Sequence, residues 1–383
     1  MGKTLKIAFL TATDARDKRS RSGTLYYMAK ALQEYCGDVY YLGPLNSRME
    51  EVTRFLNNLS LRIFKKSYAY EHSVLLSFSY ARIIKEKLKK ESFDVIFAPV
   101  ASTELAFLSK EIPIIYTADA TFSLINNYYH DYFSGQLSIS SEEGNYIEQS
   151  AINKADLLLY PSNWAANSAM DYYGANESKV KIIPYGANID KVPSREIISN
   201  KKKSDKCRLL FLGVDWERKG GEIAFETLQE LDKLGLPSEL TVCGCIPPAD
   251  FKHDNMKVIP FLDKNNPEQN KELEMLFLKS DFLLLPSRTE AYGVVFCEAN
   301  AYGLPAITTE TGGIPSVINP GKNGFMLTMD ARGIDYANLI MEIFLDDEKY
   351  YQLVRSSRET YDERLNWDNW GKTVSKYINK LIN

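Results

Sequence analysis

The sequence predicts an α/β protein of two domains, each a parallel sheet covered by helices on both faces. Short β-rich runs alternate with helical patterns in both halves of the chain, an order typical of parallel sheets. At 383 residues the chain is more than twice the length of a usual single domain, so we expect two domains with separate cores. The polar stretch SREIISNKKKSDK, residues 194–206, lies between the halves. We interpret its lysine run as a solvated linker.

Buried strands are predicted where short apolar runs are bounded by turn residues. In the first half these runs are residues 5–10, 38–42, 94–98, 113–116, 157–160 and 179–183, with clear helical patterns at 24–36 and 163–173. In the second half they are residues 208–213, 240–244, 257–261, 282–285, 306–309 and 324–328, with helices at 221–234 and from 294 onward. A last helix carries an apolar stripe through Trp367, Trp370, Val374, Tyr377 and Leu381.

Composition excludes several classes of protein. With 46 Lys and Arg against 50 Asp and Glu the net charge is only -4, so no global field recruits nucleic acid. No run reaches the ~18 apolar residues that a membrane span needs, and the first residues lack the apolar region of a signal peptide. We therefore expect a cytoplasmic protein. The five cysteines show no paired C-x-x-C spacing and the three histidines are isolated, which predicts reduced thiols and no metal site.

The most informative stretch is PSRTEAYGVVFCEANAYGLPAITTETGGIP, residues 286–315. It sets Glu290 and Glu298 around Gly293 at a predicted junction of strand and helix. The first N–H groups of a helix lack partners within it and attract anions. Glu298 falls on an apolar helix, where a carboxylate needs a bonding partner. A sugar diol would serve, and a neighbouring backbone N–H is the structural alternative.

A second motif, FLGVDWERKGGEIAFETL, places Arg218 and Lys219 just before the paired glycines that open another helix. Two cations beside a helix N-terminus suit a diphosphate, because they hold it in the ground state and counter the charge that grows as it leaves. An exposed Arg-Lys turn without a ligand is the alternative. Both motifs follow strands, and open α/β sheets bind ligands at the carboxyl ends of their strands.

The second half resembles the nucleotide-sugar site of the retaining, glycogen-synthase-like glycosyltransferases of family 4, group 1. The resemblance rests on Glu290, Glu298, Gly303 to Pro305, and Gly312 to Pro315. It implies the GT-B fold: two doubly wound Rossmann-like domains facing a cleft, with the C-terminal helix crossing back to the first. The implied domains are residues 1–191 together with about 366–383, on the acceptor side, and residues 192–365, which bind the nucleotide sugar.

The resemblance also implies roles for the motif residues. Glu298 would grip the ribose hydroxyls and Glu290 the donor sugar. Arg218 and Lys219 would hold the diphosphate with the backbone of Tyr292, Gly293 and Val294. It implies a hexosyltransferase-type enzyme that moves a sugar from a nucleoside diphosphate sugar to an acceptor hydroxyl with retention, in cell-surface glycan or glycolipid synthesis. No cofactor and no metal are expected, because these cations replace magnesium.

The first half departs from the family in two places. Ser22 and Gly23 stand where relatives usually have a glycine pair that approaches the donor phosphate, so only Gly23 is carried over. Asp119 stands where relatives commonly have histidine. We keep Asp119 as a candidate for bonding the sugar or the acceptor hydroxyl, with a plain turn aspartate as the alternative. Ser162 and Asn188 are further polar residues in segments that match cleft-lining stretches.

Two stretches are candidates for the acceptor side. An aromatic cluster could stack on sugar rings or pack in the core; its members are Phe122, Tyr128, Tyr129, His130, Tyr132 and Phe133. Residues 48–90 carry ten Lys or Arg against four acids, interleaved with apolar residues. This segment could press on the inner face of an anionic membrane that bears a lipid-linked acceptor. A solvated amphipathic helix that covers the first sheet explains it equally well.

Other readings fare less well. Residues 370–373, WGKT, end like a phosphate-binding loop but lack the preceding glycine. No G-x-G-x-x-G follows the first strand, which disfavours a nicotinamide enzyme. A glycosidase could use two carboxylates but has no use for Arg218 and Lys219. A nucleotide-sugar-binding accessory subunit without activity, motivated by Asp119, and a sugar-nucleotide epimerase of the same fold remain alternatives. The base, the sugar and the acceptor cannot be read from the sequence.

Overall fold

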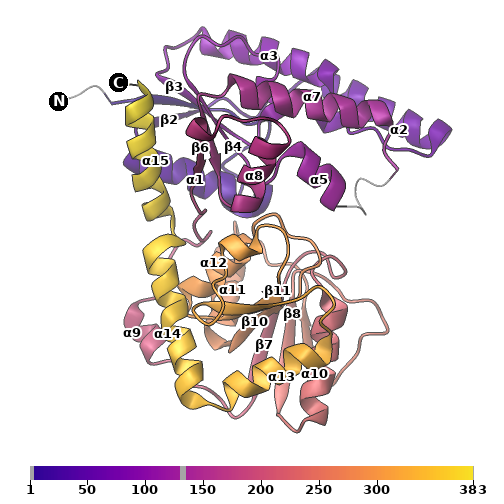
Figure 1. Cartoon of the computed structure of the whole chain (residues 1–383), viewed down its shortest axis with the longest axis vertical. Coiled ribbons are helices and arrows are strands. Elements are labelled where there is room, and N and C mark those ends of the chain that lie inside the picture. The colour runs from indigo at the N-terminus through magenta and orange to yellow at the C-terminus, as the bar shows by residue number, and fades with distance from the viewer. Residues whose placement is uncertain (1–3, 130–134, 383) are drawn as a thin grey trace. The chain divides into compact units, whose positions relative to one another are not determined.

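The computed structural model describes residues 4–129 and 135–382 of the chain. It divides into two compact units, which are described separately: unit 1 is Met1–Ile183 with Trp370–Asn383, and unit 2 is Pro184–Asn369. Each unit is a six-stranded parallel sheet with helices packed around it (Figure 1). The predicted α/β class and parallel sheets are confirmed.

Unit 1 has the strand order β2-β1-β3-β4-β5-β6. Its strands are β1 Lys6–Phe9, β2 Asp38–Tyr41, β3 Val95–Pro99, β4 Ile114–Thr117, β5 Leu157–Tyr160 and β6 Val180–Ile182. Its helices are α1 Thr24–Tyr35, α2 Arg48–Phe64, α3 Val74–Leu88, α4 Ser102–Leu105, α5 Phe122–Tyr128, α7 Ser138–Lys154 and α8 Asn163–Asp171.

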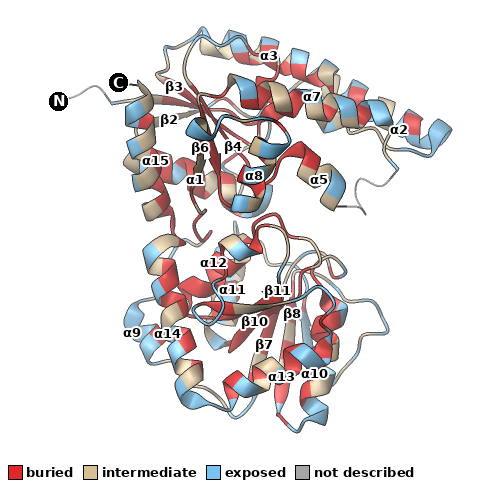
Figure 2. Ribbon diagram, in the orientation of Figure 1, coloured by how far each residue is buried: buried red, intermediate tan, exposed pale blue. Residues whose placement is uncertain are grey.

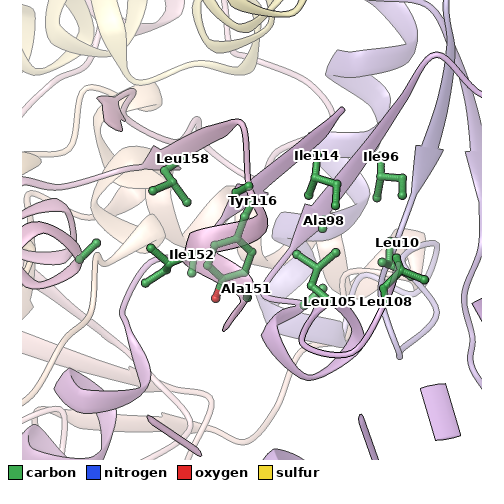
Figure 3. Close-up of a cluster of buried hydrophobic side chains, with 14 of the residues drawn as sticks. Leu10, Ile96, Ala98, Leu105, Leu108, Ile114, Tyr116, Ala151, Ile152 and Leu158 are labelled. Carbon is green, nitrogen blue, oxygen red and sulfur yellow. The ribbon is translucent and has the colours of Figure 1, made fainter. Parts of the chain in front are cut away.

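Alternating side chains of the central strands fill the two faces of this sheet. Ile96 and Ala98 of β3 join the core on the face covered by α3 and α7, together with Leu105, Ala151 and Ile152 from the helices (Figure 3). Phe97, between them in sequence, stacks on Phe9 with ring centroids 6.0 Å apart. Burial on both faces explains why the strands read as continuous apolar runs.

The last helix, α15 Trp367–Ile382, joins unit 1 from Trp370 onward. The Trp370 ring meets Phe97 edge-on at 5.9 Å. Gly371 lies so close to α1 that a Cβ there would stand 2.4 Å from the ring of Tyr35. The return of the C-terminal helix to the first unit is thus built from close packing.

Unit 2 has the strand order β12-β11-β10-β7-β8-β9. Its strands are β7 Cys207–Leu212, β8 Ser238–Cys243, β9 Met256–Ile259, β10 Phe282–Leu285, β11 Ala306–Thr309 and β12 Gly324–Leu327. Its helices are α9 Arg195–Ser199, α10 Gly221–Lys233, α11 Pro267–Lys279, α12 Val294–Ala301, α13 Gly333–Phe344 and α14 Asp347–Arg364. The inner strands of both sheets are buried over most of their length, whereas the edge strands β2, β6, β9 and β12 are largely half-buried or exposed (Figure 2).

The polar stretch after Pro193 is not the solvated linker that its composition predicts. Ser194 caps α9 by accepting a hydrogen bond from the Ile197 N–H at 3.3 Å, and Ile198 is buried. Lys203, in the lysine run, donates to the carbonyl of Phe344 at 2.6 Å. The segment is therefore tied into unit 2.

Among residues 4–129 and 135–382, no helix combines the length and the apolar character that a membrane crossing requires. All five cysteines are free thiols. Burial raises the pKa of Cys243 and of Cys297 to about 12, which keeps these thiols protonated and unreactive.

Candidate active site

The two sequence motifs meet at one edge of the unit 2 sheet. β10 pairs directly with β7, with Leu283 opposite Leu210, so their carboxyl ends are adjacent. α12 and α10 begin just beyond these ends. Each is preceded by a left-handed glycine, Gly293 with φ 87° and Gly220 with φ 74°. Two helix N-termini at one sheet edge form a site that favours negative charge.

Contacts between the motif loops are close. A Cβ at Gly220 would lie 2.0 Å from the carbonyl oxygen of Pro286, so glycine is required there for packing as well as for its positive φ. The backbone N–H of Arg288 donates to the carbonyl of Arg218 at 2.8 Å. The loop after β7 is thereby fixed to the loop after β10.

Lys219 and Glu290 form an ion pair that joins the two motifs. Their side chains are only 10% and 11% exposed. The Lys219 side chain packs so closely against Gly213 that a Cβ at Gly213 would lie 2.8 Å from the Cγ of Lys219. From the sequence, Lys219 was assigned to the diphosphate and Glu290 to the donor sugar, and their pairing was not predicted. The alternative of an exposed Arg-Lys turn is wrong.

Arg218 is held beside this pair. Its Nη1 donates to the carbonyl of Thr289 at 3.1 Å, and its Nε lies 3.6 Å from Oδ2 of Asp215. The guanidinium therefore bridges from the β7 loop to the residue just before Glu290. Asp215 was not singled out by sequence reasoning, although it lies in the same motif.

Glu298 is 3% exposed within α12. Its Oε1 accepts a hydrogen bond from Lys264 Nζ at 2.6 Å. The pKa of Glu298 is raised by burial, and the Lys264 ammonium and the Asn188 backbone oppose this shift. Lys264, in the turn after β9, is a residue that sequence reasoning missed. Its place after a predicted strand was the available signal, because that position belongs to the same sheet edge as the motifs.

The predicted diphosphate-binding backbone, Tyr292 to Val294, begins α12. Tyr292 is buried and its hydroxyl donates to the carbonyl of Tyr185 at 3.1 Å. A Cβ at Gly293 would lie 2.5 Å from the Phe296 ring. Only glycine therefore fits at the entrance to this helix.

The two remaining predicted site residues, Gly23 and Asp119, belong to unit 1. Gly23 follows β1 and precedes α1 with φ 87°, and Asp119 follows β4 and is partly buried. Both lie at the carboxyl edge of the unit 1 sheet. Glu104, after β3, lies at the same edge and was missed. It accepts the Ala12 N–H at 2.8 Å, and burial raises the pKa of its carboxyl to about 7.

Other expected site residues have structural roles. Ser162 is fully buried and caps α8 by accepting the Ala165 N–H at 3.2 Å. Phe122 of the aromatic cluster is buried too, with its ring 4.9 Å from that of His72. Tyr128 packs on Trp164 at 5.0 Å. The other members His130, Tyr132 and Phe133 lie outside the described residues. Phe122 is thus a core residue.

Within the described residues, no group of three or more His, Cys, Asp or Glu side chains is arranged to hold a metal ion. The donor set at the unit 2 edge consists of two carboxylates, each bonded to an ammonium, with a guanidinium and two helix N-termini beside them. Such a set can bind an anion and accept hydrogen bonds from hydroxyl groups.

Solved structures of low sequence identity share this fold. Sucrose-phosphate synthase from Thermosynechococcus elongatus superposes with a TM-score of 0.70 at 15% identity, over 99% of each chain. HepE of Anabaena in complex with UDP and glucose has a TM-score of 0.66 at 16% identity, over 98% of this chain and all of that one. These likenesses show the GT-B fold of two Rossmann-like units.

Sequence comparisons identify the family. A D-inositol 3-phosphate glycosyltransferase of Corynebacterium jeikeium is 23% identical over 255 residues, which are 62% of this chain. The match spans 60% of that relative's length. The model of glycosyltransferase family 4 matches residues 23–191, and the model of group 1 glycosyl transferases matches residues 194–360. The chain belongs to the family 4, group 1 glycosyltransferases.

Proposed function

We propose that this protein is a retaining glycosyltransferase that moves a sugar from a nucleoside diphosphate sugar to an acceptor hydroxyl. The observation that carries the proposal is the meeting of Arg218, Lys219, Glu290 and the N-termini of α10 and α12 at the adjacent ends of β7 and β10. Anion-binding groups beside a carboxylate fit a donor whose diphosphate leaves while its sugar reacts. HepE, solved with UDP and UDP-glucose, supports this class of donor.

In this proposal the positive groups act on the leaving diphosphate. Arg218, Lys219 and the first N–H groups of α12 bond the diphosphate oxygens, and their effect grows as charge builds during departure. No metal ion is needed, because these groups supply the positive charge themselves. Lys219 has a second task, since its ammonium orients the Glu290 carboxylate toward the donor sugar.

Two residues of unit 1, Gly23 and Asp119, are also assigned roles in the reaction. Gly23, at the start of α1, lets the donor phosphate approach the backbone. Asp119, after β4, bonds the sugar or the acceptor hydroxyl. From the family resemblance, we assign the enzyme to the synthesis of cell-surface glycans or glycolipids.

We further propose a peripheral membrane contact through the end of α2. Leu61, Ile63 and Phe64 are 44%, 58% and 61% exposed, and the cations Arg62, Lys65 and Lys66 lie among them. Figure 2 shows this end of α2 exposed. Across α2 only Thr53 and Ser60 are buried. The other helix of residues 48–90, α3, covers the sheet through Leu76, Tyr80 and Ile84, as the alternative predicts for that part. Exposed apolar side chains among cations suit an anionic lipid surface.

Turnover with UDP, GDP and ADP sugars, followed by NMR of the product anomer, tests the main proposal. Arg218→Ala should lower kcat/KM by about 10²–10³-fold. This corresponds to a loss of about 2.7–4 kcal/mol in transition-state stabilisation, the scale of a lost oxyanion donor. Glu290→Gln should lower kcat but change nucleoside diphosphate affinity by no more than about twofold, because its effect belongs to the reacting sugar. Arg208→Ala, at the opposite end of β7 with an exposed side chain, is the matched control.

The same assay separates the rivals. Unchanged turnover in Arg218→Ala would refute the diphosphate site. Conversion of donor without acceptor indicates an epimerase, and binding without turnover indicates an accessory subunit. An inverted product anomer contradicts retention. Complete loss of activity in EDTA, restored by manganese, contradicts metal independence.

A further inference from the structure

Lys264 is held in place by two acceptors at the donor site. Its Nζ donates to Glu298 Oε1 at 2.6 Å and to the backbone carbonyl of Asn188 at 3.3 Å. The Lys264 side chain is 17% exposed and that of Glu298 is 4% exposed. In an ion pair so shielded from water each partner depends on the other, because removing one leaves the other charge buried and uncompensated.

Asn188, the second anchor, is itself fixed. Its Oδ1 accepts a hydrogen bond from Trp367 Nε1 at 3.0 Å, and the neighbouring Ala187 N–H donates to the Leu365 carbonyl at 3.0 Å. The Asn188 side chain is 1% exposed. A lysine side chain normally has much rotamer freedom to lose, and here that freedom is already restricted before any ligand arrives.

The Lys264 ammonium favours the ionised form of Glu298. Burial raises the pKa of its carboxyl, and Lys264 is the first of the groups that oppose this shift, followed by the Asn188 backbone. Among the described residues, Cys297 and Tyr302 also interact electrostatically with Glu298, and neither carries a positive charge. The ionised carboxylate accepts hydrogen bonds at both of its oxygens and can therefore bond both hydroxyl groups of a diol. The protonated form uses one of these oxygens as a donor.

We propose that Lys264 is the positioning residue of the ribose site, fixing the Glu298 carboxylate and thereby setting the affinity for the 2′,3′-diol of the nucleotide. This inference rests on the assignment of Glu298 to the ribose in the proposed function. Lys264 acts through Glu298 and not on the reacting sugar. Its loss should therefore change nucleotide affinity and leave the chemical step of bound donor unaltered.

The test is calorimetric titration with whichever of UDP, GDP or ADP binds the wild type, and with the 2′-deoxy form of that nucleotide. Lys264→Met should weaken binding of the ribonucleotide about tenfold or more, as for a lost hydrogen bond to a charged group. The 2′-deoxynucleotide should be affected less, so the preference for ribose shrinks. Lys264→Arg should restore most of the preference. Lys271→Met, an exposed lysine on α11, is the matched control.

The pH dependence provides a second readout. The Glu298 carboxylate becomes protonated as the pH falls through its pKa. Removing the Lys264 ammonium moves this pKa further up. The weakening caused by Lys264→Met should therefore be larger at pH 6 than at pH 8. In a Glu298→Gln background, Lys264→Met should cause little further loss, because the two residues act as one unit.

Four outcomes would overturn the proposal. If Lys264→Met binds the ribonucleotide more tightly, Lys264 merely occupies the place of the ribose. If it weakens ribo- and deoxynucleotide equally at every pH, its effect is structural and not directed at the diol. If Glu298→Gln weakens the nucleotide but Lys264→Met does not, the inference fails alone. If Glu298→Gln itself has no effect, the ribose assignment in the proposed function fails as well.

Discussion

Both site carboxylates have cationic partners, since Lys219 pairs with Glu290 and Lys264 pairs with Glu298. Buried ion pairs contribute little net stability, because desolvation offsets the attraction between the charges. Removing one partner is costly, since the other charge is then left uncompensated. The pairs therefore keep the site polar and ordered.

The Lys219 pair provides a prediction for stability. Lys219→Ala leaves the Glu290 carboxylate buried without its ammonium, so the free energy of unfolding should fall by about 3–5 kcal/mol. Urea denaturation at pH 7 measures this change. Lys233→Ala removes an exposed partner of Glu230, with Lys233 69% exposed, and should cost at most about 0.5 kcal/mol. Equal effects of the two substitutions would mean that the Lys219 pair is solvated like the surface one.

The site residues that the sequence predicted lie in local patterns. Glu290 and Glu298 share one strand-to-helix unit, and Arg218 and Lys219 share another, so local patterns were enough to name them as candidates. Their pairing partners are far away along the chain: Lys219 is 71 residues from Glu290, and Lys264 is 34 residues from Glu298. Which cation reaches which carboxylate depends on the strand order β10-β7-β8-β9, and local spacing does not contain that order.

At the scale of elements, apolar runs predicted the strands well because parallel strands are buried on both faces. Three predicted strands, β5, β10 and β11, match the structure at both ends. The short helix α9 was missed, since its five residues lie in a polar stretch and its one buried residue, Ile198, gives no periodicity. Polar composition could not reveal that this segment packs against α14.

The exposed end of α2 leads to a prediction for vesicle binding. Ile63→Ser with Phe64→Ser removes apolar area, and Lys65→Gln with Lys66→Gln removes charge. Each charge near an anionic surface contributes about 1 kcal/mol. The double variant Lys65→Gln, Lys66→Gln should therefore weaken binding to phosphatidylserine vesicles by roughly thirtyfold at low salt. Binding of the wild type should also weaken as salt rises, because the Debye length shortens.

Co-sedimentation measures this binding. Leu345→Ser is the control, because Leu345 is 65% exposed but lies in unit 2. The membrane contact is refuted if the wild type ignores the vesicles at low salt. It is also refuted if the α2 variants bind as well as the Leu345 variant.

At the scale of the whole molecule, the chain passes between its two units twice, near Pro184 and near Trp370. Each unit has its own sheet and its own buried core. Apart from Gly23 in unit 1, the residues proposed to bind the nucleotide, from Arg218 to Glu298, lie in unit 2. The end of the chain contributes instead to unit 1, through Trp370 and the residues after it.

This division predicts that damage to the last helix from Trp370 onward is confined to unit 1. Trp370 is 1% exposed and packs on Phe97 of β3, so Trp370→Ala should cost unit 1 about 3–5 kcal/mol, the usual range for a large aromatic core truncation. Hydrogen exchange should speed up in peptides covering β3, while peptides covering β10 keep their protection. Affinity for the nucleoside diphosphate should change by no more than about twofold, since sites without shared partners behave additively.

Lys376→Ala is the control, because Lys376 is exposed on the same helix. It should change neither the hydrogen exchange nor the nucleotide affinity. Equal loss of protection in β3 and β10 would contradict the prediction, because it would mean that the two units unfold as one.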